Sequence, residues 1–406
     1  MQHDISQRFT AEETCAPLDR QPEEAVLAEL RALVAEVQGR SLFLIHYYQP
    51  TWIKRLLREA GAQLVEADSQ ALARAGRESD RELLVCITVP FMAGSSAILA
   101  RPEQQVVLAD VDAGCSLEAS APEDLVVEML ERTALLAPTV HDARTLQRGQ
   151  FIPVCYTNVS AQVKAVTGEF GGIICTSSNA TNAVRWVLER GGCPVFLPDQ
   201  HLAANVAAEL GLSRLAFWRH TERDGGLTDT ELREAELVVW TGECNVHVKT
   251  EAEVIEAFVA RHPRGHLLLH PEVPHAHVRV ALARAGREHV GVGSTRFIHQ
   301  RLAQLAEAEP GATVGIATET NFVSELQEAY RGKLEVQNLL RNVCACVHMR
   351  TRPEALLGAL RAITSGALER SRHLVHLSSD VRTLALAALE RSLMLKDEPF
   401  TLNWTA

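Results

Sequence analysis

Three cysteines lie in polar, turn-like surroundings although they are far apart in the sequence. Cys115 lies in Gly-Cys-Ser-Leu, Cys244 in Gly-Glu-Cys-Asn-Val-His and Cys346 in Cys-Ala-Cys-Val-His-Met. No local finger motif joins them, so they meet only if the fold brings them together. Three thiolates on one metal centre leave a four-coordinate site one ligand short, which is typical of a catalytic rather than a structural site.

Ordinary burial is the alternative for any single cysteine, because a free thiol behaves as a small apolar side chain. We interpret the remaining cysteines as core or surface residues, namely Cys15, Cys86, Cys155, Cys175, Cys193 and Cys344. Cys344 stays ambiguous because it lies two residues from Cys346 and is an alternative ligand or a redox partner.

Composition narrows the class of protein. The chain has 406 residues, enough for about two to three domains. Hydrophobic residues make up 47% and charged residues 22%, as in an ordinary globular protein, and the net charge is −11. The negative charge argues against nucleic acid or an anionic membrane as a partner. No apolar stretch is long enough to span a membrane, and no basic-then-apolar segment resembles a secretory signal. Nine cysteines, an odd number, argue against a disulfide framework, so we expect a cytoplasmic protein.

Short apolar runs rich in β-branched residues alternate with segments of helical period. This alternation predicts an α/β fold with mainly parallel sheets. The expected strands are residues 42–45, 83–87, 106–108, 152–155, 172–175, 195–197, 237–240, 267–269, 290–292 and 314–317. The expected helices are residues 23–38, 179–190, 250–261, 296–308, 321–330, 353–364 and 380–395.

Polar clusters follow most of the expected strands. Examples are His-Tyr-Tyr-Gln at 46–49, Tyr-Thr-Asn-Val-Ser at 156–160, His-Pro-Glu at 270–272 and Thr-Glu-Thr at 318–320. Ligands of parallel α/β sheets bind at the carboxyl ends of the strands. One or two clusters would be explained by helix capping, but so many of them favour a shared binding site.

These motifs resemble the quinolinate synthase family. The resemblance also rests on Ala-Asp-Ser at 67–69, Thr-Ser-Ser-Asn at 176–179, Pro-Asp-Gln-His-Leu at 198–202 and Gly-Ser-Thr at 293–295. Their order matches the family from about residue 40 to 395. The family condenses iminoaspartate with dihydroxyacetone phosphate to quinolinate, phosphate and water in de novo NAD biosynthesis. The resemblance implies these substrates and one [4Fe–4S] cluster per chain on three cysteines, Cys115, Cys244 and Cys346; an enzyme supplying iminoaspartate is a further candidate partner.

The resemblance also implies three similar αβα domains with parallel sheets around a central cluster site. We expect a polar N-terminal tail (1–24), three domains that carry one cluster cysteine each (25–130, 131–248 and 249–350), and C-terminal helices that pack back on the core (351–406).

The candidate site residues divide into two groups. For proton transfer we expect Tyr48, Glu272 and His270, with the pKa of a carboxyl group in a closed pocket raised towards neutrality. For substrate binding we expect His46, Ser69, Tyr156, Asn158, Ser177, His247, Ser294 and Thr295. Their alternatives are structural: helix caps for the hydroxyl residues, and hydrogen-bonded core side chains for the histidines. Zinc on the histidines lacks a supporting spacing.

Some segments depart from the family pattern. Residues 91–97, Phe-Met-Ala-Gly-Ser-Ser-Ala, lack the acid and the lysine that the family usually carries there. The region of residues 50–57 resembles a loop longer than the usual one. Two other functions stay open: an iron–sulfur scaffold or sensor without catalysis, and a cluster hydro-lyase acting on another small dicarboxylate, for which the altered segment 91–97 is the only support.

Overall fold

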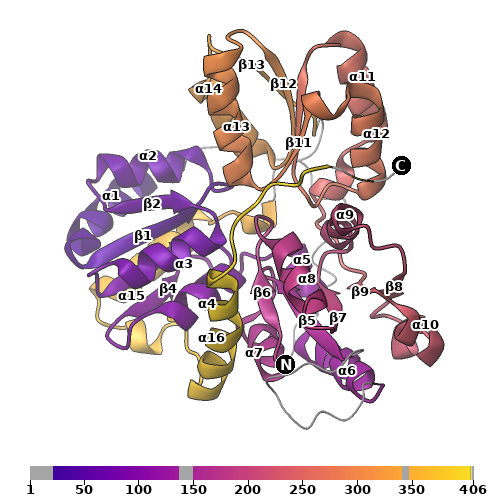
Figure 1. Cartoon of the computed structure of the whole chain (residues 1–406). Helices are drawn as coiled ribbons and strands as arrows, with labels where there is room; N and C mark the ends of the chain where they lie inside the picture. The colour runs from indigo at the N-terminus through magenta and orange to yellow at the C-terminus, as the bar shows by residue number, and fades with distance from the viewer. Residues whose placement is uncertain (1–21, 137–149, 341–346, 403, 405–406) are drawn as a thin grey trace. The chain divides into compact units, whose positions relative to one another are not determined.

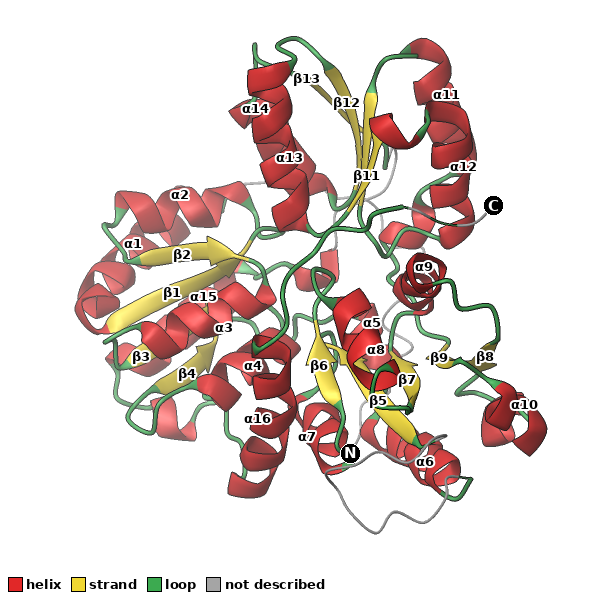
Figure 2. Cartoon of the chain, viewed as in Figure 1, coloured by secondary structure: helices red, strands yellow, loops and turns green. Residues whose placement is uncertain are grey.

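The computed structural model describes residues 22–136, 150–340, 347–402 and 404, and within them the chain forms three parallel β-sheets covered by helices (Figures 1 and 2). Every pair of neighbouring strands in these sheets runs parallel. The predicted α/β class with parallel sheets is confirmed.

Sheet 1 has the strand order β2-β1-β3-β4. Its strands are β1 (Ser41–His46), β2 (Leu64–Ala67), β3 (Leu83–Ile87) and β4 (Gln105–Leu108). Successive side chains of a strand point to opposite faces, so Phe43 and Ile45 enter one apolar cluster and Leu42 and Leu44 enter another. The first cluster includes α1 (Glu24–Val37), α2 (Thr51–Glu59) and α15 (Pro353–Thr364), and the second includes α3 (Ser69–Glu78) and α4 (Pro90–Leu99).

Sheet 2 has the order β6-β5-β7-β9-β8. Its strands are β5 (Phe151–Tyr156), β6 (Ile173–Cys175), β7 (Cys193–Leu197), β8 (Leu215–Trp218) and β9 (Leu237–Trp240). Helices α6 (Glu123–Ala134) and α7 (Ala161–Glu169) contact each other and β5, whereas α8 (Ala180–Leu188) and α9 (Gln200–Leu210) contact each other and β7. Two short helices, α5 (Ser116–Ser120) and α10 (Asp229–Glu234), lie in connections.

Sheet 3 has the order β11-β10-β12-β13. Its strands are β10 (His266–Leu269), β11 (Val290–Val292), β12 (Thr313–Ala317) and β13 (Glu335–Asn338). Helices α11 (Ala252–Arg261) and α12 (His275–Ala285) lie on one side of this sheet and α13 (Thr295–Ala308) on the other (Figure 1). The other two α-helices of the described residues are α14 (Thr320–Ala329) and α16 (Ser379–Leu393).

The three sheets share one topology. In each sheet the first strand along the chain, β1, β5 or β10, lies between the second and the third. Parallel strands align their carboxyl ends, so the polar clusters that follow the strands of one sheet gather at one edge of it. The loop after the first strand of each sheet carries site residues predicted from the sequence.

The described chain forms two compact units. One comprises the described parts of Met1–Cys115, Glu319–Glu325 and Asn342–Arg382, and it contains sheet 1. The other comprises the described parts of Ser116–Thr318, Leu326–Arg341 and Thr383–Ala406, and it contains sheets 2 and 3. The domain limits expected from the sequence stay a prediction.

The structure differs from the expectations drawn from the sequence in two respects. The expected loop near residues 50–57 is largely helix α2, whose residues Trp52, Ile53, Leu56 and Leu57 recur at helical spacing and are buried. Strands β2, β8 and β13 were not predicted. All three are edge strands with partly exposed residues, so they lack the continuous apolar run of a strand covered on both faces.

None of the helices in the described ranges is both long and apolar enough to cross a membrane.

Candidate active site

Glu272 lies at the centre of a buried hydrogen-bond network. It follows strand β10, and only 3% of its surface is exposed. Its Oε1 accepts a hydrogen bond of 2.5 Å from the hydroxyl of Tyr156, at the end of β5. Its Oε2 lies 2.8 Å from Nδ1 of His247, in the turn after β9. The carboxyl edges of sheets 2 and 3 therefore supply one network within a single unit.

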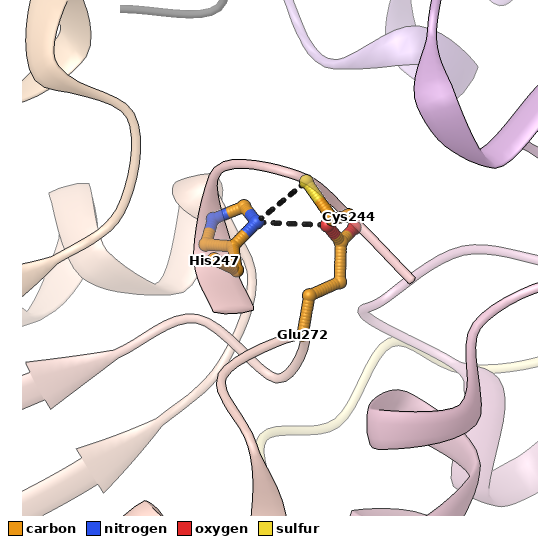
Figure 3. Close-up of side chains that lie close together, drawn as sticks. All are labelled: Cys244, His247 and Glu272. Atoms are coloured by element: carbon orange, nitrogen blue, oxygen red, sulfur yellow. Dashed lines mark hydrogen bonds and ion pairs between the residues drawn. The ribbon is translucent and has the colours of Figure 1, made fainter. Parts of the chain in front are cut away.

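His247 joins the network through both ring nitrogens. Its Nδ1 lies 3.2 Å from Sγ of Cys244 and 2.8 Å from Glu272, and Figure 3 shows these three side chains together. Its Nε2 lies 3.0 Å from Oγ1 of Thr318, which follows β12. With the carboxylate of Glu272 ionised, Nδ1 is the donor of that hydrogen bond, whereas the Thr318 hydroxyl can pair with Nε2 as donor or as acceptor.

Thr318 is a site residue that sequence reasoning left without a role. It is fully buried and its hydroxyl contacts His247. The available signal was its position in the polar Thr-Glu-Thr cluster after an apolar strand.

His270 packs against this network as a neutral ring. It stacks on His247 with ring centres 4.4 Å apart and an interplanar angle of 18°. Its Nδ1 accepts a 3.4 Å hydrogen bond from the backbone N–H of Glu272. Burial, and then the neighbouring His247, lower the pKa of His270 to about 3. His270 therefore carries no proton to donate as an imidazolium near neutral pH, and its expected role in proton transfer stays a prediction.

The pKa of Glu272 differs from the expectation. Burial raises it, but the adjacent His247 and the hydrogen bonds from His247 and Tyr156 outweigh burial and hold it below its usual range. The expected rise towards neutrality was therefore wrong. Its physical reason is that the pocket contains partners which stabilise the charged form, so Glu272 is a carboxylate at neutral pH.

The loop after β1 repeats part of this arrangement in the other unit. His46 is buried at the end of β1, and its Nδ1 accepts a 3.3 Å hydrogen bond from the backbone N–H of Tyr48. The two rings meet edge to face, 4.6 Å between centres. The same bond links His270 and Glu272. His46 is the last residue of β1 and His270 directly follows β10, and each binds the amide of the candidate proton carrier two residues later.

The hydroxyl residues show capping as well as a capacity for binding. Ser294 caps α13 by accepting a 3.4 Å hydrogen bond from the N–H of Phe297, and it receives a 2.8 Å bond from the hydroxyl of Ser178. Thr295 is the first residue of α13 and is 5% exposed. Because a helix N-terminus attracts anions, this segment suits a carboxylate or a phosphate.

The remaining predicted binders lie at comparable positions. Ser69 is the first residue of α3, but Asp68 caps that helix through a 2.9 Å bond to Ala71 N–H, so the hydroxyl of Ser69 is not needed as the cap. Ser177 and Asn158 are half-buried in the turns that follow β6 and β5.

Two of the three predicted cluster ligands lie within the described residues. Cys115 follows β4 and is buried, and Cys244 follows β9 and is half-buried. Cys346 lies outside the described residues, as do Cys15 and Cys344. Burial raises the pKa of Cys86, Cys155 and Cys193, inside strands, to about 12, which disfavours the thiolate that binds iron.

Hydrogen bonds within each unit connect residues that lie close in sequence to the predicted ligands. Ser116, the residue after Cys115, accepts a 3.1 Å bond from Asn245 N–H and donates one of 3.3 Å to the Glu243 carbonyl, on the two sides of Cys244. Gly114, the residue before Cys115, donates a 2.7 Å bond to the carbonyl of His348, two residues after Cys346. Cys115 and Cys244 lie outside strands, as suits thiolate ligands of an iron–sulfur cluster. Among the described residues, ligand atoms of Cys244, His247 and Glu272 also lie within 4.8 Å of one another.

Comparisons with known proteins agree with the motifs. The family model described as Quinolinate synthetase A protein matches residues 29–394. A protein of Nocardioides sp. named quinolinate synthase is 36% identical over 382 residues, which cover 91% of this chain and 89% of the relative. Quinolinate synthase of Streptomyces coelicolor is 34% identical, covering 91% and 88%. That of Listeria monocytogenes serovar 1/2a is 32% identical, covering 90% and 94%.

Proposed function

Because the chain belongs to the quinolinate synthase family, we propose that it condenses iminoaspartate with dihydroxyacetone phosphate to give quinolinate, phosphate and water, as a cytoplasmic enzyme of de novo NAD biosynthesis. The observation that carries this proposal is the buried network of Tyr156, Glu272 and His247. A protein that only carried a cluster would have no use for a desolvated carboxylate held by two donors, because burying such a charge opposes folding.

One [4Fe–4S] cluster on Cys115, Cys244 and Cys346 is the proposed cofactor. It is supported by the contacts of Ser116 with the neighbours of Cys244, and of Gly114 with His348. A cluster iron without a protein ligand supplies Lewis-acid chemistry towards a substrate oxygen or nitrogen, which favours loss of water.

Glu272 is the proposed general base. The reaction requires tautomerisation of the ketone phosphate, imine formation and ring closure, and each step moves protons. Glu272 is ionised and 3% exposed, so it is in the form that accepts a proton, and its two Oε atoms are held by hydrogen bonds from Tyr156 and His247. Tyr156 and His247 orient the carboxylate, and His270 supports the His247 ring by stacking.

Tyr48 is the second proposed proton carrier. Its backbone N–H binds His46, and Asn321 donates a 3.0 Å bond to its carbonyl, so its main chain is held on both sides. We assign substrate binding to the other residues predicted from the sequence: His46, Ser69, Tyr156, Asn158, Ser177, His247, Ser294 and Thr295. Both substrates carry anionic groups, and the start of α13 with Ser294 and Thr295 is the place we propose for one of them.

The departure at residues 91–97 gives no support to a different substrate. These residues lie in α4, which packs on α3, and Gly94 is buried in this helix. The changed positions therefore belong to the packing of α4 on α3 in sheet 1, and the unit that contains them is not the one that contains Glu272. No observation favours a hydro-lyase over the family reaction.

The deciding experiment measures quinolinate formed from iminoaspartate and dihydroxyacetone phosphate by protein purified without air. Iminoaspartate is unstable, so an enzyme that generates it belongs in the assay and is the partner we expect in the cell. Formation of quinolinate by the parent chain and not by the Cys244→Ala variant supports the proposal. Cluster-loaded protein that forms none would contradict it.

A further inference from the structure

The loop after the first strand of each sheet carries site residues, and its main-chain carbonyls accept hydrogen bonds from a buried side chain. The three loops follow β1, β5 and β10 and carry Tyr48, Asn158 and Glu272. In each case the donor is a buried polar side chain from a neighbouring helix, with no assigned part in binding or proton transfer. The three donors are Lys54, Lys164 and Asn205.

Lys54 holds the loop after β1. Its side chain is 1% exposed, and its Nζ donates a 3.0 Å bond to the carbonyl of Tyr47. The same ammonium group lies 2.6 Å from a carboxylate oxygen of Glu66 and 2.6 Å from one of Glu325. The ammonium group therefore has acceptors on three residues, with both carboxylate oxygens of Glu325 in reach, and this directs Nζ at the backbone next to Tyr48.

Lys164 holds the loop after β5 in the same way. It is fully buried, and its Nζ donates a 2.8 Å bond to the carbonyl of Val159, next to Asn158. Lys54 and Lys164 each lie eight residues after the last residue of the preceding strand, His46 and Tyr156. The two lysines thus occupy the same place in the shared topology.

Asn205 holds the loop after β10. It is fully buried in α9, and its Nδ2 donates bonds of 2.8 Å to the carbonyl of Pro271 and 3.1 Å to that of Val273. Its Oδ1 lies 2.9 Å from Nδ1 of His275, which fixes the orientation of the amide. The two accepting carbonyls flank Glu272 on both sides.

We propose that Lys54, Lys164 and Asn205 are positioning residues that hold Tyr48, Asn158 and Glu272 in their reactive positions by fixing the loop backbone. The proposal rests on the proposed function, because it presumes that these loops carry the chemistry. A displacement of about 1 Å at a reacting group lowers the rate on the order of 100-fold, so a donor that touches no substrate still controls the rate.

The first test measures order in the loops and does not depend on activity. Hydrogen–deuterium exchange is followed in the full chain, purified without air, for the parent and for Lys164→Met and Asn205→Leu. Exchange is expected to rise at least about tenfold in residues 156–160 for the first variant and 270–273 for the second, with little change elsewhere. Unchanged exchange in both loops would overturn the proposal, whatever the enzyme makes.

Lys54 needs a compensated variant, because removing it alone leaves the Glu325 carboxylate without its lysine and leaves Glu66 with Arg58 only, so the chain could fail to fold. The triple variant Lys54→Met, Glu66→Gln, Glu325→Gln removes all three charges and keeps the side-chain volumes. Exchange is expected to rise about tenfold in the loop of residues 46–49. A folded triple variant with parental exchange in this loop would exclude Lys54 as an anchor.

A matched control uses a buried donor at the opposite edge of a sheet. Gln104 is 8% exposed and donates to the carbonyls of Gly76, Ser79 and Arg81, just before β4 begins. Gln104→Met is expected to loosen residues 76–81 and to leave kcat within about twofold of the parent. If Gln104→Met lost as much kcat as the Lys54, Lys164 and Asn205 variants, any buried donor would affect the rate. That result would contradict a positioning role for these three residues.

The second test asks whether each anchor acts through the residue it holds. Asn205→Leu is expected to lower kcat on the order of 10- to 100-fold in the parent, but less than threefold when Glu272→Gln is already present. Lys164→Met is likewise expected to lower kcat in the parent, but much less when Asn158→Ala is already present. Equal losses in both backgrounds would make the anchors merely structural. A parent chain that forms no quinolinate would contradict the proposed function, and the exchange measurements would still decide the ordering of the loops.

Discussion

Replacing Glu272 with Gln tests the role of the buried network directly. The substitution keeps the shape and volume of the side chain and removes its charge and its capacity to accept a proton. In the parent both carboxylate oxygens accept hydrogen bonds, from the hydroxyl of Tyr156 at 2.5 Å and from Nδ1 of His247 at 2.8 Å. A glutamine offers one acceptor oxygen and one NH₂ group, so its oxygen can accept from Nδ1 of His247 only if its NH₂ faces the Tyr156 hydroxyl, which must then accept instead of donate.

The expected loss follows from two contributions. One hydrogen bond to a charged group is worth about 1.5–3 kcal/mol, which is the upper limit that we expect for the loss of folding stability. Loss of general-base catalysis lowers a rate by roughly 10²- to 10⁴-fold. At 1.36 kcal/mol for each factor of ten, the lower end of that range corresponds to about 2.7 kcal/mol of transition-state stabilisation. We therefore expect quinolinate formation at least ~100-fold slower, with cluster content and fold preserved.

The assay compares single-turnover rates and iron content of the parent, Glu272→Gln and a matched control. Glu243→Gln is that control, because it makes the same chemical change at a half-exposed carboxylate beside Cys244. The control is expected to stay within about threefold of the parent. If Glu272→Gln forms quinolinate at a rate near that of the parent, Glu272 is not the base, and the reasoning from its burial and its two donors fails.

Three further outcomes are expected. Purified without air, the parent should hold about four iron atoms per chain. Variants with Ala in place of Cys115, Cys244 or Cys346 should lose the iron, whereas Cys155→Ala, inside β5, should keep it. Full iron content in any of the first three variants would refute the ligand set. Tyr48→Phe should retain the cluster and fold while forming quinolinate at least ~100-fold more slowly, the scale of a lost acid or base, and a parental rate would remove Tyr48 from proton transfer. Burial lowers the pKa of Lys164 from 10.5 to about 8 against the opposing effects of Glu118 and Cys155. Between these two pH values the unfolded chain binds more protons than the folded chain, so the free energy of unfolding should rise by about 3 kcal/mol from pH 8 to 10.5. Denaturant unfolding of Lys164→Met should lack this rise, and a rise equal to that of the parent would disprove the low pKa.

The parts of the fold visible in the sequence are those buried on both faces. Strands β3 and β9 were predicted with the limits that the structure shows, because each is a continuous apolar run between turn residues. The edge strand β13, Glu-Val-Gln-Asn, was missed because its place in a sheet is decided by pairing with β12 and not by its own composition. Helix α2 was taken for a loop because its four buried apolar residues were compared with a family pattern and not with the helical period.

For the site, the sequence by itself determined which residue types follow which strands, and the parallel α/β class then placed them at the carboxyl edges of the sheets. Only the tertiary structure decided which of them meet. It joined Tyr156, His247 and Glu272 from separate strands, added Thr318, and reversed the direction expected for the pKa of Glu272. The physical reason is that composition and spacing are properties of the chain, whereas hydrogen-bond partners and burial depend on side chains that approach one another only after the sheets have formed.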